Sequence, residues 1–420
     1  MISNLRAPQA GLRQDGISAY CQELFASFAR SDQRRWGEVY LRGLLHATGR
    51  KTPANISEQV LGRRAVQPIQ QFVNQSTWAV GDVRRRLAEL VCDAAAPQAW
   101  AFHDVVFPKN GTRSAGVARQ FVPAEGRIMN CQLAMTTSLV HAGGSQPVNW
   151  QLLMPRRWDA DEELRGQAHV PADARYLPRW RYVLDSLDQM LEDWDVPSAP
   201  VLADWSFEKE VEPLLLGLEE RGLSYLVEVG GSTTLPACTT GAHRVLPVGH
   251  HGHVPARGPV TVRRRAADLA DALGEQGERA VLAWRDGPTT RSRHSQFLVV
   301  PLSVGLPGRR GRFADVLPPA QRHLVVEWPF GRSQPRTYWV TNQPVHRLGD
   351  LVAQAELRGR AVDDCERLHR EYGLTDFEGR SFRGWHHHVT LVSAAFGFDL
   401  LHGMEAMAQL TAEQLSPALG

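Results

Sequence analysis

The chain has 420 residues, of which 43% are hydrophobic and 22% are charged. That much apolar material can form a large core, and the length predicts two or three domains. These values exclude an intrinsically disordered, collagen-like or small disulfide-stapled protein. No run of 18 or more apolar residues occurs and the N-terminus lacks an apolar signal core, so we expect neither a transmembrane helix nor a secretory signal.

Cysteine spacing and charge narrow the class further. The five cysteines are scattered without a C-x-x-C pair, so we expect no disulfide framework or zinc site and a reducing, cytoplasmic location. The net charge of +2 conceals an asymmetry. Residues 1–150 carry 17 Lys/Arg against 10 Asp/Glu, whereas residues 151–230 carry 8 against 17. A basic N-terminal part permits nucleic-acid binding without requiring it.

The first elements in chain order are helices followed by strands. Residues 16–95 predict helices, because apolar side chains such as Trp36 and Tyr40 recur at helical spacing. From residue 99 the pattern changes to β-rich runs that predict an antiparallel meander. These runs cover residues 99–107, 116–122 and 128–140.

A parallel pair of strands is expected next. An apolar-periodic helix at 178–194 precedes a short buried strand that ends at Asp204, and a helix near 208–221 leads to a strand at 224–229. The order strand, helix, strand implies parallel strands joined by a right-handed crossover.

The rest of the chain predicts a β-rich insertion and two closing helices. Residues 230–345 are rich in Gly, Pro and Arg and contain short β-like runs. Helices are predicted at 348–371 and 385–402, the second apolar on most sides and therefore buried.

Common catalytic motifs are absent from the sequence. It contains no Walker loop, dinucleotide-binding glycine motif, G-x-S-x-G or H-E-x-x-H. GHHGH (249–253) falls in a Gly/Pro-rich stretch and is interpreted as a loop. His386, His387 and His388 open the last helix, where successive residues point about 100° apart, so one metal ion cannot bind all three. We expect local capping or a phosphate contact there.

The order of elements suggests a metal-dependent nuclease fold. One strand carries His103 and Asp104, a later strand ends at Asp204, and a helix follows the β-rich insertion. This is the ribonuclease H-like order, in which converging carboxylates hold two divalent metal ions for phosphodiester cleavage. Magnesium prefers such oxygen ligands.

Long strings carry a resemblance to a known family. They include FARSDQRRWGEVYLRGLL (28–45), FPKNGTRSAGVARQF (107–121), GRIMNCQLAM (126–135), VLAD (201–204) and GLTDFEGRSFRGWHHHVTL (373–391). In order and spacing the chain resembles bacterial insertion-sequence transposases of the DDE (Asp-Asp-Glu) superfamily, in the branch common in actinobacteria and cyanobacteria. The resemblance spans residues 25–400.

The resemblance implies a fold, cofactors and partners. The expected fold class is α/β, a ribonuclease H-like mixed sheet with an N-terminal helical domain and a β-rich insertion before the last helices. Mg²⁺ or Mn²⁺ is the implied cofactor, double-stranded DNA the implied partner, and a homo-oligomer associated with the nucleoid the implied assembly. The expected domains are a helical DNA-binding domain (1–97), the core (98–229), the insertion (230–347), the closing helices (348–404) and a tail (405–420).

Only one of the family's first two acidic positions carries an acid in this chain. Its first Asp begins an Asp-acid-Thr-Gly-Phe run, which aligns here with HDVVF, so that His103 stands at the place of the first metal ligand. Asp104 matches the variable acid beside it and should point to the opposite face of the strand. Asp204 matches the second Asp and is the expected metal ligand.

The third acid is missing at its family position. The family signature Tyr-(2)-Arg-(3)-Glu-(6)-Lys falls here on Ala355, Arg358, Val362 and His369, so only the arginine is retained. Glu366 lies one turn further along the same helix face, but neither it nor Asp363 or Asp364 obviously replaces the missing acid.

Three functions remain open from the sequence. The first is a non-cutting DNA-binding protein, either decayed or domesticated. The second is an active transposase that uses Asp204 with substitutes such as Asp104 and Glu366. The third is a pocket rebuilt for acid–base chemistry on a small molecule through His103, Asp104, Asp204 and His369. The candidate DNA-facing residues are Arg34, Arg35, Arg42, Lys51, Lys109, Arg119, Arg127, Arg358 and Arg380.

Overall fold

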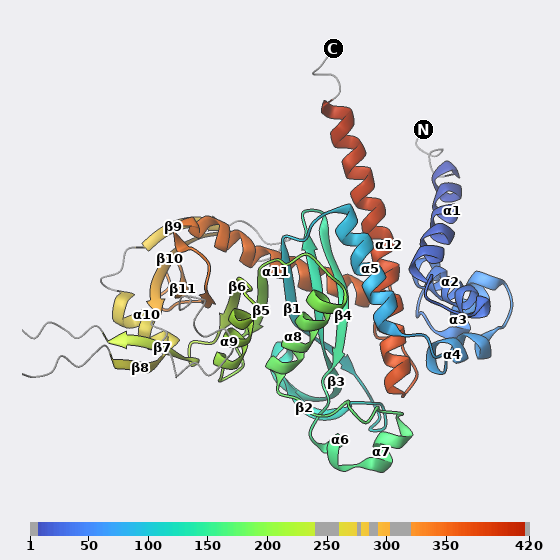
Figure 1. The fold of residues 1–420 in the computed structure, drawn as a ribbon, viewed down its shortest axis with the longest axis horizontal. Helices are drawn as coiled ribbons and strands as arrows, with labels where there is room; N and C mark the ends of the chain where they lie inside the picture. The colour runs from blue at the N-terminus through green and yellow to red at the C-terminus, as the bar shows by residue number, and fades with distance from the viewer. Residues whose placement is uncertain (1–6, 240–259, 275–278, 285–292, 303–320, 416–420) are drawn as a thin grey trace, which may run out of the picture. The chain divides into compact units, whose positions relative to one another are not determined.

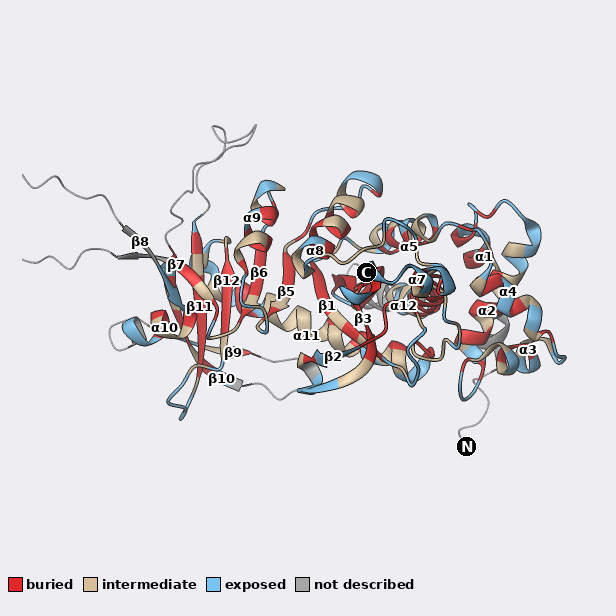
Figure 2. Cartoon of the chain, turned by 90° about the horizontal axis from the view of Figure 1, so that it is seen from below, coloured by how far each residue is buried: buried red, intermediate tan, exposed pale blue. Residues whose placement is uncertain are grey.

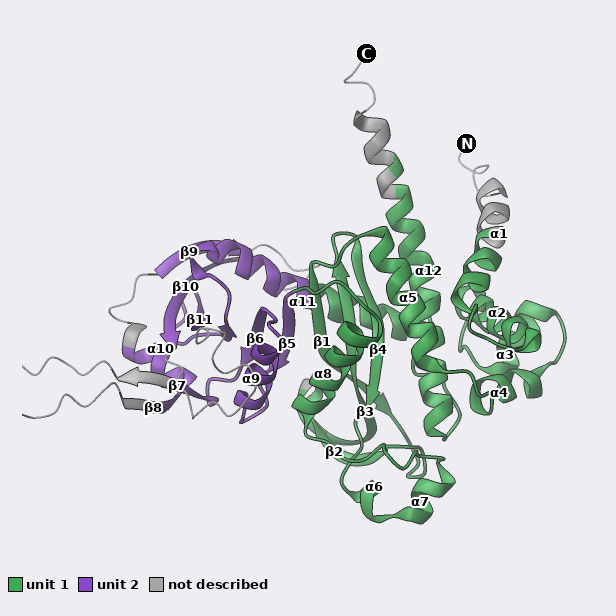
Figure 3. Cartoon of the chain, viewed as in Figure 1, with its two compact units in different colours: residues 1–199, 360–420 green, residues 200–359 purple. Residues whose placement is uncertain are grey.

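The computed structural model describes residues 7–239, 260–274, 279–284, 293–302 and 321–415 (Figure 1). The chain divides into two compact units, unit 1 from residues 1–199 and 360–420 and unit 2 from residues 200–359 (Figure 3). Each unit combines helices with strands, so the predicted α/β class is confirmed. Within the described part of the chain, every helix is too short or too polar to span a lipid bilayer.

The first part of unit 1 is helical, as its apolar spacing predicts. Local sequence sets the ends of α3, where the Thr52 hydroxyl accepts the Asn55 N–H, Pro53 occupies the first turn and Gly62 closes the helix at a φ of 62°. The helices are α1 (Ala7–Leu24), α2 (Ser31–His46), α3 (Pro53–Leu61), α4 (Val66–Asn74) and α5 (Val80–Ala94).

The sheet of unit 1 differs from the predicted meander. The long strand β3 (Arg127–His141) pairs antiparallel with β1 (Ala99–Pro108), with β2 (Ala118–Val122) and with β4 (Gly144–Leu152), so β3 lies between β1 and β2. The length of β3, 15 residues, explains the difference. One edge of β3 pairs with β2 over its first part and with β4 over the remainder, so β1 pairs along the opposite edge.

Strand β4 was not predicted, because its sequence contains turn-forming residues. Gly144 adopts a φ of 154° at the start of the strand. Pro147 lies where the register between β3 and β4 shifts, at Thr137 and Ser138. A β-bulge accommodates a residue that cannot donate a ladder hydrogen bond. The local sequence therefore does not predict β4, which forms because it pairs with β3.

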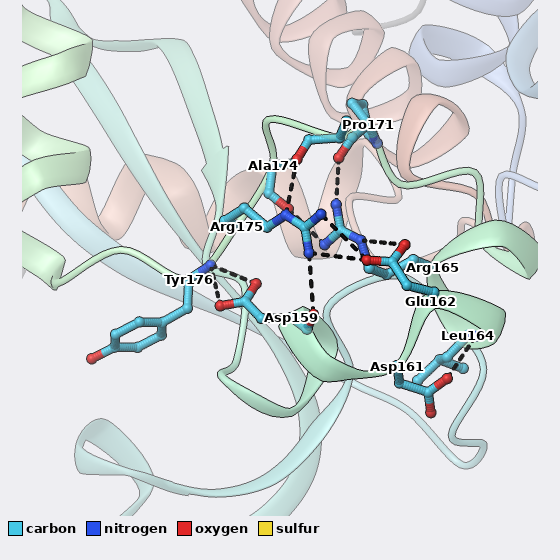
Figure 4. Close-up of polar contacts among 10 residues, drawn as sticks. Asp159, Asp161, Glu162, Leu164, Arg165, Pro171, Ala174, Arg175 and Tyr176 are labelled. Atoms are coloured by element: carbon cyan, nitrogen blue, oxygen red, sulfur yellow. Dashed lines mark hydrogen bonds and ion pairs between the residues drawn. The ribbon is translucent and has the colours of Figure 1, made fainter.

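A compact polar lobe follows β4. The helices α6 (Arg157–Ala160) and α7 (Glu162–Gln167) are held against the following segment by two arginines, as Figure 4 shows. Arg165 donates to the carbonyls of Pro171 (2.6 Å) and Ala174 (2.9 Å), and Arg175 donates to the Asp159 carbonyl (3.1 Å). The helix predicted at 178–194 follows as α8 (Arg179–Asp188) and a π-helical turn, η2 (Gln189–Asp193).

The helix α12 (Phe382–Leu415) runs through the core of unit 1, as predicted for the last helix. Residues 384–398 are all buried (Figure 2). The Trp385 ring meets Phe107 edge to face at 5.4 Å, and Ser393 accepts the Trp150 indole N–H at 2.8 Å. The α1 residue Tyr20 donates its hydroxyl to the Ala394 carbonyl at 2.9 Å.

Unit 2 confirms the predicted parallel pair. Strands β5 (Val201–Trp205) and β6 (Tyr225–Val229) pair in parallel and flank α9 (Glu212–Glu220). The sheet continues antiparallel in the order β6-β12-β11-β10-β9, and β7 pairs with β8 separately. The β-rich character predicted for residues 230–345 is thus found in β7 (Thr234–Thr239), β8 (Val260–Arg265), β9 (Arg279–Trp284), β10 (Arg293–Leu302), β11 (Arg322–Pro329) and β12 (Thr337–Thr341). The helix α10 (Ala266–Gly274) lies between β8 and β9 in the chain.

Candidate functional site

Asp204 is held by its own turn at the end of β5. One oxygen, Oδ1, accepts the Ser206 backbone N–H at 2.9 Å and the Ser206 hydroxyl at 2.6 Å. Such short side-chain-to-backbone bonds stabilise the turn that follows the strand. The predicted metal ligand is therefore already bonded within its own loop.

The other Asp204 oxygen faces an arginine. The helix α11 (Leu348–Glu371) carries Arg358, whose guanidinium lies 3.6 Å from Asp204 Oδ2 and 2.7 Å from Glu228 Oε2. All three side chains are partly exposed and belong to unit 2. Arg358 was predicted to face DNA, but here it bridges two carboxylates.

Glu228 is the acid that sequence reasoning missed. It occupies the fourth position of β6, and Asp204 occupies the fourth position of β5, with which it is in direct register. In neighbouring parallel strands such residues lie on the same face. The signal was present in the sequence, since a single acid interrupts an otherwise apolar strand, YLVEV.

His103 and Asp104 have different surroundings on β1. His103 is buried, with 6% of its surface exposed, and pairs in register with Thr136 of β3. Asp104 is more exposed, and its Oδ1 lies 2.9 Å from Nη2 of Arg179 at the start of α8. This alternation agrees with the expected opposite faces. Asp104 is thus paired with a cation of unit 1.

The second half of α11 belongs to unit 1 and carries the other family positions. Val362 is partly buried, whereas Glu366 is exposed to solvent. His369 packs near the Phe107 ring at 6.2 Å, and burial lowers the pKa of its imidazole. Asp364 is the buried acid of this segment: its Oδ2 accepts the Ser145 N–H (2.8 Å) and hydroxyl (3.0 Å), which ties α11 to the start of β4.

The three consecutive histidines of α12 are buried, which corrects the expected phosphate contact. His387 lies between the carbonyls of Val73 (2.8 Å) and Trp78 (3.1 Å). His388 contacts the Tyr40 hydroxyl (2.9 Å), and Arg84 contacts His386 (3.1 Å). Burial lowers the pKa of His387 and of His388 to about 4, so both are neutral near pH 7. The tract at 249–253 lies outside the described residues.

Several of the candidate DNA-facing residues have structural roles. Lys51 is buried with its ammonium on the Ala47 carbonyl, which argues against a phosphate contact. Arg42 bonds to Glu38 and Ser18, and Arg34 donates to the Phe28 carbonyl. Arg35 is exposed and lies over the Trp36 ring at 5.4 Å.

The remaining candidates lie at the surface of unit 1. Arg119 and Arg127 are exposed on β2 and β3, and Arg127 lies 3.3 Å from Glu125. Lys109 and Arg380 line one cleft of about 530 Å³. Among the residues that the structure describes, no group of three or more His, Cys, Asp or Glu side chains could hold a metal ion.

Comparisons with known proteins give the family. A search of curated proteins found no match. Among solved structures, a cryo-EM structure of the piggyBac transposase synaptic complex with hairpin DNA is similar at a TM-score of 0.43 and 8% identity, covering 94% of this chain and 73% of that one. The sequence profile of the family described as DDE superfamily endonuclease matches residues 23–291, more than half of the chain. The chain therefore belongs to the DDE superfamily of endonucleases.

Proposed function

We propose that this chain is a DNA-binding member of the DDE superfamily that does not cut DNA. The observation that carries the proposal is the state of Asp204, the one acid retained at the family positions. Its Oδ1 accepts two hydrogen bonds from Ser206. Its Oδ2 lies 3.6 Å from Arg358, which also binds Glu228. An arginine cation between the two carboxylates supplies the positive charge that a metal ion supplies in an active site.

The residues present do not fit two magnesium ions. Two-metal catalysis requires several converging carboxylates, and magnesium demands oxygen ligands in near-octahedral geometry. The two other family positions are His103, an imidazole suited to softer metals, and Val362, which has no donor atom. Asp104 and Glu366, the substitutes considered from the sequence, are respectively paired with Arg179 and exposed on α11. These side chains therefore do not support a two-metal cleavage step.

Binding to double-stranded DNA is supported by charge. The first 150 residues carry seven more basic than acidic residues, 17 against 10. Exposed arginines such as Arg35, Arg119 and Arg127 lie on α2, β2 and β3 of unit 1. Neutralising phosphates with such groups releases counterions and gives an affinity that falls steeply with salt. The family description, endonuclease, names enzymes that act on nucleic acids.

A paired assay tests the proposal. Fluorescence anisotropy with a labelled duplex should show an affinity that falls linearly with salt on logarithmic axes, with a slope of about −0.9 for each phosphate neutralised. Supercoiled plasmid incubated with Mg²⁺ or Mn²⁺ should remain uncut. Wild-type protein that nicks the plasmid, with activity lost in Asp204→Asn, would refute the non-cutting assignment. An affinity for the duplex that does not change with salt concentration would refute the proposed DNA binding.

One observation favours metal-dependent cutting as a second candidate. Asp204 and Glu228 are in direct register on neighbouring strands, so two carboxylates lie on one face. If this pair bound a metal ion, Glu228→Gln would abolish plasmid nicking as completely as Asp204→Asn. Nicking that survives both substitutions would come from a contaminant.

A further inference from the structure

Two loops of unit 1 line an open cleft of about 530 Å³. One loop, residues 108–114, follows β1, and the other, residues 375–380, precedes α12, with Arg50 completing the lining. The two loops have the sequences PKNGTRS and TDFEGR. A cleft of this volume lies in the range typical of ligand sites and is larger than one phosphate requires.

Neutral groups hold the loops in place. The Ala115 N–H donates to the Arg380 carbonyl at 3.0 Å, which joins the two loops. The Asn130 side-chain amide donates to the carbonyls of Lys109 (2.6 Å) and Gly111 (2.8 Å), and Lys109 N–H donates back to the Asn130 carbonyl (3.0 Å). The guanidinium groups of Arg113 and Arg380 take no part in these bonds.

The cleft has more positive than negative charge. Its lining contains Arg50, Lys109, Arg113 and Arg380 against one acid, Glu378. Arg50 is balanced, because it lies 3.4 Å from Asp376 and 3.7 Å from Glu378. The other three cations of the lining are Lys109, Arg113 and Arg380.

Those three cations lack an acidic partner within the described residues. The guanidinium groups of Arg113 and Arg380 are exposed and make no ion pair there. The Lys109 ammonium has only a long contact, 3.4 Å, with the Phe377 carbonyl, and burial lowers its pKa. Burying a cation without a counter-charge is unfavourable, and a bound anion would remove that cost.

We infer that this cleft binds a phosphate group, with Lys109, Arg113 and Arg380 as its cationic ligands. An arginine fork matches two phosphate oxygens and a lysine adds a point charge. The hydroxyl groups of Thr112 and Ser114 and the Asn110 amide line the same cleft. The inference rests on the proposed function, since an open cleft on the surface accepts a phosphodiester of the DNA backbone, although a free phosphorylated molecule offers the same chemistry.

Differential acetylation of the full-length protein tests the site directly. The chain has only three lysines, Lys51, Lys109 and Lys209. Lys209 is exposed and Lys51 is buried, so they serve as reactive and unreactive internal controls. Duplex DNA, and inorganic phosphate compared with chloride at equal ionic strength, should each protect Lys109 several-fold while Lys209 stays reactive. Mass spectrometry after digestion resolves the three sites.

A charge-matched pair of variants supplies the second arm. Arg113→Gln/Arg380→Gln should weaken duplex binding at least tenfold at low salt and reduce the salt slope by about 1, as expected for one phosphate contact. Arg63→Gln/Arg64→Gln removes the same charge from an exposed loop outside the cleft and should weaken binding far less. Circular dichroism melting confirms that both variants are folded.

The outcomes separate the two proposals. If the wild-type protein binds duplex DNA but Lys109 is unprotected and the two double variants bind alike, the phosphate site is wrong and DNA binding stands. If the wild-type protein fails to bind DNA but inorganic phosphate still protects Lys109, the site is real, its ligand is a free phosphorylated molecule, and the proposed function fails. If neither ligand protects Lys109, the inference is overturned.

Discussion

At the scale of single residues, unit 2 buries an arginine between two acids. The side chain of Arg322 is 0% exposed, and its guanidinium binds Glu219 at 2.6 and 2.9 Å and Glu212 at 2.7 Å. The Tyr225 hydroxyl also donates to Glu219 at 2.8 Å. The network joins the start of β11 to α9, next to the strand pair that carries Asp204.

Removing this arginine should be costly. Arg322→Met leaves two acids without their counter-charge, and breaking a buried ion pair in this way typically costs about 3–5 kcal/mol. We expect a corresponding fall in the free energy of unfolding, measured by urea denaturation and tryptophan fluorescence. Arg265→Met, which breaks the solvent-exposed pair with Asp268, is the control and should change stability little. Equal losses in the two variants would contradict the structural role of Arg322.

Buried His388 predicts a pH dependence of stability. Its ring contacts the Tyr40 hydroxyl and the carbonyls of Gly373 and Leu374. Burial lowers its pKa from 6.5 to about 4, because it outweighs the two carbonyls and Asp376, which raise the pKa, and Lys109 adds a smaller lowering effect. The unfolded chain takes up a proton below pH 6.5, but the folded chain does so only near pH 4. The free energy of unfolding should therefore fall by about 3 kcal/mol between these values, since each pKa unit corresponds to about 1.4 kcal/mol.

Substitution isolates the contribution of this histidine. His388→Gln keeps a side chain that can donate to a carbonyl but removes the titrating group. Its unfolding free energy, measured in urea from pH 4.5 to 7.5, should depend less steeply on pH than that of the wild-type protein. His346→Gln, at an exposed position, should leave the slope unchanged. An unchanged slope in His388→Gln would show that other groups cause the acid sensitivity.

At the scale of elements, Arg165 holds the segment between α7 and α8. Its side chain is 3% exposed and donates to the Pro171 and Ala174 carbonyls, as drawn in Figure 4. Arg165→Met should release residues 168–178, so that limited trypsin digestion cuts after Arg175 much faster than in the wild-type protein. Arg181→Met, which removes an exposed pair with Asp185 on α8, should not accelerate that cut. Equal protection in both variants would show that packing alone holds the segment.

Element order was more predictable than strand pairing. The parallel pair of strands was predicted from an apolar run, a helix and a second apolar run, because each of these is visible in the local sequence pattern. The position of β3 between β1 and β2 was not predictable, because pairing depends on long-range contacts. At the candidate site, Asp204 was identified by family position, but Glu228 was missed because its place beside Asp204 depends on the register between β5 and β6, which is set by strand pairing. Arg84, the first of three consecutive arginines, is likewise not recognisable from local pattern as a buried residue, yet it bonds to Asn149 and Thr390 in the interior.

At the scale of the whole molecule, the proposed loss of cutting is a loss of two of the three family acids. His103 and Val362 stand at two of the three family positions, and both belong to unit 1. Restoring the family acids in His103→Asp/Val362→Glu should therefore create a metal-dependent interaction that the wild-type protein lacks. Because His103 is buried, a carboxylate there without a counter-ion is unfavourable. The variant should melt below the wild-type protein in EDTA.

Manganese should reverse that loss. A ligand that binds only the folded state at about 100 times its Kd stabilises it by about 2.7 kcal/mol, so the melting temperature of the variant should rise with Mn²⁺ while that of the wild-type protein stays constant. The neutral counterpart His103→Asn/Val362→Gln should not respond. Plasmid nicking that appears only in the acid variant with Mn²⁺ would show that the two lost acids are what separates this chain from a cutting enzyme. An acid variant without any Mn²⁺ response would mean that further ligand positions have also changed.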